Sequence, residues 1–241
     1  MRTRAPPVRP VVLAPREAGA CAGCEVRERS VCSAVPDDVL ARLAAVASAV
    51  HYPKGATFIA EGTPASAFFN VTHGTAKLFK LLPDGRQQIT GFASAGHFLG
   101  LAATDRYGFG AEAIEPMCLC RFERAKLAGL LRELPDLERR LLETACNELA
   151  TAQEHMVLLG RKTAAERVAS FLLNWTRCAP DGDVHLPMTR GEIADHLGLT
   201  IETVSRTFTQ FRAGRRVATP STDSVRVLDR PWLEDLALAA G

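Results

Sequence analysis

Three features that would point to other classes of protein are missing from this 241-residue sequence. It has no apolar run of the roughly eighteen residues that a transmembrane helix needs. The apolar stretch at residues 11–14, which follows a basic and proline-rich start, is too short for the core of a secretion signal. The formal net charge is only +2, so any surface that binds nucleic acid must be locally basic. We therefore expect a cytoplasmic chain with no membrane partner.

Cysteine, in contrast, is present seven times. Disulfides are disfavoured in a chain without a secretion signal, and clustered cysteines there more often bind metal or do redox chemistry. Cys21 and Cys24 form a Cys-x-x-Cys pair, and Cys32 follows after seven further residues. Three close cysteines with a distant fourth suit a four-thiolate site for an iron–sulfur cluster or zinc. Zinc ligands usually come as two close pairs, so this spacing favours the cluster.

The first half of the chain is predicted to be rich in short strands. Residues 36–49 read as a short amphipathic helix, whereas residues 50–122 alternate β-rich pieces with glycine turns. Asp84-Gly85 lies between two such pieces and is a strong hairpin signal. This pattern predicts a small antiparallel barrel or roll.

Residues 134–160 have a helical period, with an apolar residue at every third or fourth position over three heptads. Such a helix is too long to be covered by one small domain, so it is interpreted as a two-helix dimer interface. The alternative is a helix packed on its own barrel. The residues predicted to face the partner are Leu141, Ala145, Leu149, Ala152, Met156 and Leu159.

The last third of the chain contains a helix-turn-helix pattern at residues 189–213. Thr189 and Glu192 form a capping box, Gly198 supplies the turn, and Thr200 caps the second helix. Ile201, Val204, Phe208 and Phe211 are predicted to form the buried stripe of that helix. Residues 217–228 read as a small hairpin, the wing of a winged helix, and a closing helix follows it.

The opposite face of the second helix carries side chains suited to base edges. Arg206 can fork onto guanine, and Glu202 can accept a hydrogen bond from cytosine. Taken alone, Glu202 and Arg206 could be an ordinary surface pair at i, i+4. The combination of caps, turn glycine and buried stripe is much more specific, and it indicates binding to double-stranded DNA. The predicted DNA-binding residues are Glu202, Ser205, Arg206, Thr200, Thr203 and Arg190.

Together these elements resemble the cyclic-AMP receptor/FNR (CRP/FNR) superfamily of regulators, and residues 188–206 look very much like the signature of its FNR branch. The resemblance implies an α+β chain with a β-roll sensor domain, a long dimerisation helix and a C-terminal winged helix-turn-helix. The expected order is a mobile arm at 1–20, the cluster loop and β-roll at 21–133, the dimerisation helix at 134–160, and the DNA-binding domain at 161–241. Glu202, Ser205 and Arg206 would then read TTGAT-type half-sites.

The FNR branch holds an oxygen-labile [4Fe-4S] cluster with three N-terminal cysteines and one from the sensor domain. By this resemblance the ligands are Cys21, Cys24, Cys32 and Cys120. Cys118 remains a candidate for the fourth ligand, since residues 118 and 120 point to the same side of a strand. The loop before Cys32 is longer than in the best-known member of the branch.

The resemblance implies an oxygen-sensing transcription regulator, mainly an activator, that binds TTGAT-N4-ATCAA-like palindromes as a homodimer and recruits RNA polymerase. No cyclic nucleotide is expected, because no arginine is placed to pair with its phosphate and Glu112 would repel one. The alternative is a constitutive or otherwise gated regulator of the same superfamily with a structural zinc or a redox-thiol site. An enzyme is not expected, since no catalytic base accompanies the cysteines.

Overall fold

The computed structural model describes residues 11–15, 21–102, 104–177 and 183–238. The chain divides into two compact units, residues 1–150 and residues 151–241, and each is described by itself. Residues 11–15 were expected to belong to a mobile arm. They instead form strand β1 (Val11–Pro15), which pairs antiparallel with β2 (Ala47–Tyr52). The remainder of the predicted arm lies outside the described residues.

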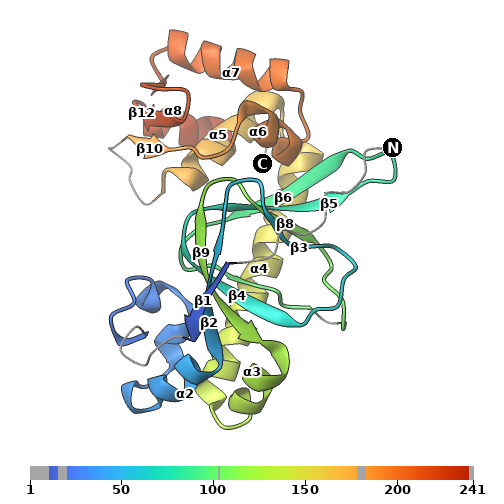
Figure 1. Cartoon of the computed structure of the whole chain (residues 1–241). Helices are drawn as coiled ribbons and strands as arrows, with labels where there is room; N and C mark the ends of the chain where they lie inside the picture. Colours follow the sequence, from blue (N-terminus) through green and yellow to red (C-terminus); the bar gives the residue numbers. More distant parts are fainter. Residues whose placement is uncertain (1–10, 16–20, 103, 178–182, 239–241) are drawn as a thin grey trace. The chain divides into compact units, whose positions relative to one another are not determined.

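The first unit contains the predicted roll of antiparallel strands (Figure 1). One sheet has the strand order β1-β2-β9-β4-β7 and the other β3-β8-β5-β6. The strands are β3 (Thr57–Ile59), β4 (Ala67–His73), β5 (Ala76–Leu81), β6 (Gln87–Ala93), β7 (Phe98–Leu99), β8 (Gly110–Ala113) and β9 (Met117–Glu123). The hairpin predicted at Asp84-Gly85 joins β5 to β6.

Successive side chains of a strand point to opposite faces of its sheet. Both faces of the five-stranded sheet β1-β2-β9-β4-β7 are covered by buried side chains. Met117 and Leu119 of β9 belong to one buried cluster, inside the roll. Cys120 and Phe122 belong to a second cluster on the other face, which we call the outer core. Its buried members are Val31, Val35, Leu40, Leu43, Ala47, Phe68, Phe98, Cys120, Phe122, Leu127, Leu130, Leu137 and Leu141.

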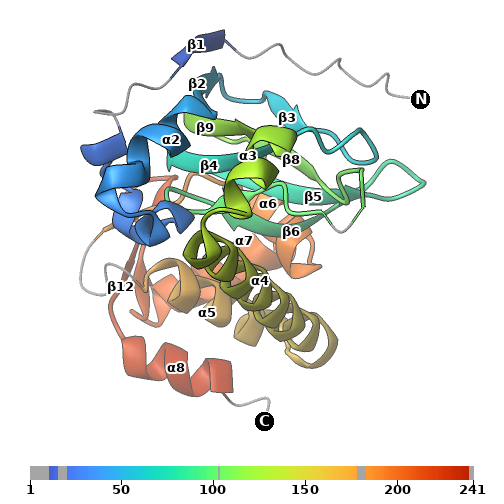
Figure 2. The same cartoon turned by 90° about the horizontal axis from the view of Figure 1, so that it is seen from below.

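Short helices and the start of the long helix α4 cover that outer face, as Figure 2 shows for α2, α3 and α4. They are η1 (Arg27–Arg29), η2 (Val31–Ala34), η3 (Asp37–Val39), α2 (Leu40–Ala45), α3 (Arg124–Leu131) and α4 (Pro135–Arg161). The helix predicted over residues 36–49 was too long. It ends at Ala45 because Ala47 begins β2, where residues 47–52 pair with β9.

The second unit is a winged helix-turn-helix built on the last turns of α4. Its elements are α5 (Ala164–Trp175), β10 (Val184–His185), α6 (Arg190–Leu197), α7 (Ile201–Ala213), β11 (Val217–Ala218), β12 (Ser224–Val227) and α8 (Arg230–Leu238). β10, β12 and β11 form a small antiparallel sheet in that order, the predicted wing. In the part of the chain that the structure describes, every helix is too short or too polar to cross a membrane.

Candidate functional site

The α6–α7 pair is fixed by local interactions along the chain. Both halves of the predicted capping box are present, since Thr189 Oγ1 accepts from the Glu192 N–H and the Glu192 carboxylate accepts from the Thr189 N–H. α6 ends at Gly198, whose φ of +62° is left-handed and favours glycine. The Leu199 N–H then donates to the Ala194 carbonyl over 3.0 Å. The angle between the helices is therefore set by residues within a short stretch of sequence.

One face of α7 is buried against the rest of the unit, mostly as predicted. Val204, Phe208 and Phe211 lie in the core. Ile201 was predicted to join them, but its side chain is 52% exposed, because it is the first residue of the helix and sits at the rim near Gly191. Thr207, which the pattern did not include, is also buried on this face, and it donates its hydroxyl to the Thr203 carbonyl over 2.9 Å.

The opposite face of α7 exposes Glu202, Ser205 and Arg206, the three predicted base readers. Thr200 caps the helix by accepting from the Thr203 N–H over 3.2 Å. Hydrogen bonds from the helix's first turn and Thr200 hold the pKa of Glu202 below its ordinary value, so this carboxylate is ionised at neutral pH. The face therefore offers an acceptor, a hydroxyl and a forked donor within two turns, which matches the hydrogen-bonding code of the major groove.

Thr203, another predicted DNA contact, is half-buried, and Arg190 is engaged within its own unit. Its guanidinium lies over the Phe208 ring, 3.5 Å from the ring centroid. Burial against the ring lowers its pKa from the ordinary arginine value. Arginine over an aromatic face is a stabilising cation–π contact. Arg190 thus packs against α7 through the Phe208 ring, a role that the sequence pattern did not reveal.

Along α4 an apolar row of side chains is left exposed, but it differs from the predicted dimer interface at both ends. Leu149 is 60% exposed and Met156 is 64% exposed, and Ala145 and Ala152 between them are exposed as well. Leu141 was predicted to face a partner, yet it is only 8% exposed because it packs into the outer core.

Two further positions of α4 refine that prediction. Leu142, seven residues before Leu149, is exposed and takes the place of Leu141 in the heptad repeat. Leu159, at the other end, is half-buried within the second unit. The repeat of seven from 142 to 149 to 156 was present in the sequence and is the signal that could have found Leu142.

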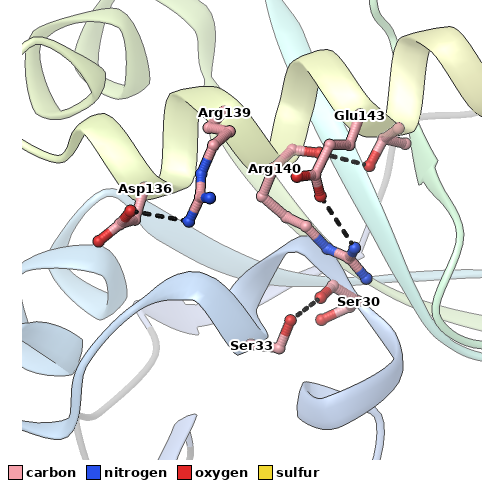
Figure 3. A network of polar contacts seen from close by, with 7 residues as sticks. Ser30, Ser33, Asp136, Arg139, Arg140 and Glu143 are labelled. Atoms are coloured by element: carbon pink, nitrogen blue, oxygen red, sulfur yellow. Dashed lines mark hydrogen bonds and ion pairs between the residues drawn. The ribbon is translucent and has the colours of Figure 1, made fainter.

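The segment of residues 21–35, which we call the cysteine loop, is fastened to the outer core. Ser30 is buried, and its hydroxyl accepts from the Cys32 N–H over 3.2 Å and donates to the Arg27 carbonyl over 3.1 Å. The turn before β7 approaches so closely that a Cβ on Gly96 would lie 2.9 Å from the Arg29 carbonyl oxygen. Figure 3 shows Arg140 of α4 reaching toward Ser30 of this loop. The loop is therefore held between the sheet and the start of α4.

Three of the four predicted cluster ligands share this layer. Cys120 is 5% exposed in the outer core, and the half-buried Cys21 and Cys32 pack against the same cluster. Cys32 and Val31 also line a small apolar cavity there. Cys24 is outside the cluster, although its N–H donates to the Cys21 carbonyl over 3.4 Å.

The competing candidate, Cys118, has a different environment. Its Sγ lies 3.6 Å from Nδ1 of His51 on the neighbouring strand β2, and it is not part of the outer core. Burial and packing thus distinguish the two cysteines where strand periodicity did not. They favour Cys120 as the one that faces the cysteine loop.

Four thiols are the donor set that iron–sulfur clusters use, so the chemistry of these residues fits such a group. Within the described residues, however, no three His, Cys, Asp or Glu side chains are gathered closely enough to hold a metal ion. None of the six cysteines at positions 21, 24, 32, 118, 120 and 146 is in a disulfide. The structure thus brings three of the four predicted ligands to one layer without assembling a finished site.

Comparison with known proteins finds one family model in each of the two units. The family model of a Crp-like helix-turn-helix domain matches residues 166–236, and that of a cyclic nucleotide-binding domain matches residues 49–133. The structure of FixK2 from Bradyrhizobium japonicum has a TM-score of 0.78 at 36% identity, covering 81% of this chain and 100% of that one.

Two curated relatives match nearly the whole length. The nitrogen fixation regulation protein FixK of Bradyrhizobium diazoefficiens is 43% identical over 225 residues, which cover 91% of this chain and 94% of that protein. The transcriptional activator protein FnrL of Cereibacter sphaeroides is 33% identical over 218 residues, which cover 87% and 88%. The predicted fold and resemblance are confirmed, and the chain belongs to the CRP/FNR superfamily of DNA-binding transcription regulators.

Proposed function

We propose that this protein is an oxygen-responsive transcription activator that binds palindromic DNA as a homodimer under the control of a [4Fe-4S] cluster. The observation that carries the proposal is the convergence of Cys21, Cys32 and Cys120 on one apolar layer beneath the start of α4. The same layer buries Leu137 and Leu141 of that helix. A change at the cysteines therefore acts directly on the packing of the helix whose continuation carries the exposed apolar face.

The DNA half of the proposal rests on the exposed face of α7. Arg206 would fork onto guanine, Glu202 would accept from cytosine, and Ser205 would take an adjacent base edge. Two copies of the helix in a twofold dimer read two inverted half-sites about one helical turn apart. The target would accordingly resemble TTGAT-N4-ATCAA.

The homodimer is supported by the apolar face of α4. Leu142, Leu149 and Met156 recur every seven residues and are exposed in the single chain. A contiguous apolar face on a helix surrounded by charged residues marks an interaction surface. Because the repeat is a heptad, the partner that fits best is the same helix of a second copy.

Cys21, Cys24, Cys32 and Cys120 are the residues that would hold the cluster. When bound, the cluster would react with oxygen and be lost, as the resemblance to the FNR branch implies. The chain's own part is to keep the cysteine loop on the outer core, through Ser30 and through the close approach of Gly96 to Arg29. The apolar neighbours Val31 and Phe98 limit the access of water to Cys32.

RNA polymerase is the proposed further partner, and the cytoplasm the proposed location, as for other bacterial activators of this superfamily. We do not expect a cyclic nucleotide to be the effector. Lys77, which is nearly buried, pairs with Glu112 on the neighbouring strand over 2.9 Å. This ion pair already satisfies the lysine, and its carboxylate would repel an incoming phosphate.

The decisive experiment is a gel-shift titration on TTGAT-N4-ATCAA DNA with protein prepared without oxygen, repeated after exposure to air. We expect a brown protein that binds the site and loses both colour and affinity in air. Cys120→Ser should prevent binding, whereas the matched control Cys118→Ser should leave it intact. A colourless protein with stoichiometric zinc and equal binding in air would contradict the proposal and support the structural-zinc alternative.

A further inference from the structure

The outer core contains one uncharged polar side chain that the fold itself does not explain. Asn70, in the middle of β4, is 1% exposed. Its Oδ1 is buried and has no hydrogen-bond partner among the described residues. Buried amide groups without a partner destabilise a folded protein, and each such group calls for an explanation. The backbone of Asn70, in contrast, is in register with both neighbouring strands.

The position of Asn70 suggests what its side chain serves. In the sheet register Asn70 lies directly opposite Cys120 of β9, and on its other side it lies opposite Phe98 of β7. Residues opposite one another in an antiparallel pair point to the same face, with their Cβ atoms about 4.5–5.5 Å apart. Cys120 and Phe98 both belong to the outer core, so Asn70 points into it too. The fourth member of this row is Ala49, a small residue opposite Cys120 on β2.

The cysteine loop covers this same row, since Cys21 and Cys32 pack on the outer core. An asparagine amide has two N–H donors at one end and an acceptor oxygen at the other, and a half-turn about its last side-chain bond exchanges them. Hydrogen bonds to the ligand sulfurs are one of the ways in which proteins tune iron–sulfur clusters. Replacing a group that hydrogen-bonds to a metal ligand typically weakens metal binding by about ten- to a hundredfold.

We propose that Asn70 is a positioning residue for Cys120, donating an N–H hydrogen bond to its sulfur when the four thiolates hold the cluster. This inference rests on the proposed function and names a residue that it does not use. Asn70 favours the loaded state through this N–H donation, which stabilises the ligated sulfur. The thiolate cannot pair with Oδ1, because both atoms only accept hydrogen bonds.

A matched pair of variants tests this. Asn70→Val and Asn70→Thr have nearly the same shape and both suit a strand, but only threonine keeps a donor. The full-length proteins are reconstituted without oxygen, and the rate of iron release to a colorimetric ferrous chelator is followed. We expect release from Asn70→Val to be about tenfold faster than from the wild type, with Asn70→Thr in between. The urea midpoint of cluster-free Asn70→Val should be equal to or above that of the wild type.

Equal iron release from the wild type and Asn70→Val would overturn the inference while leaving the proposed function standing. A cluster-free Asn70→Val with a lowered urea midpoint would also overturn it, because the asparagine would then have a purely structural role. A wild-type chain that takes up no iron would overturn the proposed function, and with it this inference. The three failures are distinguishable from one another.

Discussion

Helices α4 and α7 each expose one set of side chains that the proposed function uses, and the two sets differ in chemistry. The exposed face of α7 carries Glu202, Ser205 and Arg206, whereas that of α4 carries Leu142, Leu149 and Met156. α7 buries its other face within the second unit, whereas α4 is buried only near its start, at Leu137 and Leu141, and residues 145–154 are exposed on all sides. The two sets of side chains differ in how they interact with water. Polar side chains are well solvated in water and can hydrogen-bond to a polar ligand, whereas an exposed apolar row of this length favours association with another apolar surface.

The two helices would also contribute to binding through different interactions, hydrogen bonds on α7 and burial of apolar area on α4. On α7 a few hydrogen bonds would select one base over another, so each residue contributes specificity. On α4 the contribution comes from burying apolar area, so it does not depend on which bases are bound. Changes on the two helices should therefore affect different observables.

The largest effect is expected from Leu149→Glu on α4. It places a charge at the centre of the exposed apolar face, and an unpaired charge buried in an interface costs about 3–5 kcal/mol. We expect the dimer to dissociate at micromolar concentration in sedimentation velocity, and binding to palindromic DNA to fall with it. Thr151→Glu, which adds the same charge on another exposed face of the helix, is the control and should remain dimeric. A dimer that survives Leu149→Glu would show that α4 is not the interface.

An intermediate effect is expected from Arg206→Ala on α7. Loss of a forked contact to guanine costs about 1–3 kcal/mol for each half-site. Affinity for the palindrome should fall, and the discrimination against a changed guanine should fall with it, while the sedimentation coefficient stays unchanged. The control Arg212→Ala, at a residue also exposed on α7, should weaken binding equally to all sequences, because a contact to phosphate carries no sequence information. Unaltered base discrimination in Arg206→Ala would exclude this residue as a base reader.

The same two helices show how far the sequence alone could predict the molecule. The α7 face was predicted residue by residue, because cap, turn and stripe lie within 25 residues and follow helical periodicity. On α4 the period was recognised but its phase was ambiguous, since Leu141 and Leu142 are adjacent. Only the outer core, which is built from distant segments, shows that Leu141 is the buried one.

The cysteine layer lay further beyond what the sequence could establish. The spacing of Cys21, Cys24 and Cys32 indicated a shared site, but its fourth member depended on a resemblance. The choice of Cys120 over Cys118 gains support from long-range packing, which puts only Cys120 in the outer core. No pattern in the sequence pointed to Asn70, because its relation to Cys120 exists only in the register of β4 with β9.

Where α4 meets α6 within the second unit, two histidine rings are stacked. His155 of α4 and His196 of α6 have centroids 4.3 Å apart with an interplanar angle of 12°. Phe171 lies edge-on to His196, and Arg167 donates to the carbonyls of Leu159 and Leu197 nearby. Burial, helped by the charge of Arg167, holds the pKa of His155 below its ordinary value of 6.5 despite an opposing hydrogen bond with the backbone of His196.

The smallest effect is therefore a pH dependence of the second unit. A histidine that stays neutral in the folded state takes up a proton on unfolding at a pH below about 6.5, so its contribution to stability is present above that pH and is lost as the pH falls.

Both tryptophans, Trp175 and Trp232, lie in this unit, so their fluorescence follows its unfolding in urea. Between about pH 7.5 and about pH 5.5 the wild-type midpoint should fall, and His155→Phe, which keeps the stacking, should reduce that fall. If His155→Phe has the wild-type pH dependence, the stacked contact between α4 and α6 is insensitive to the protonation of His155.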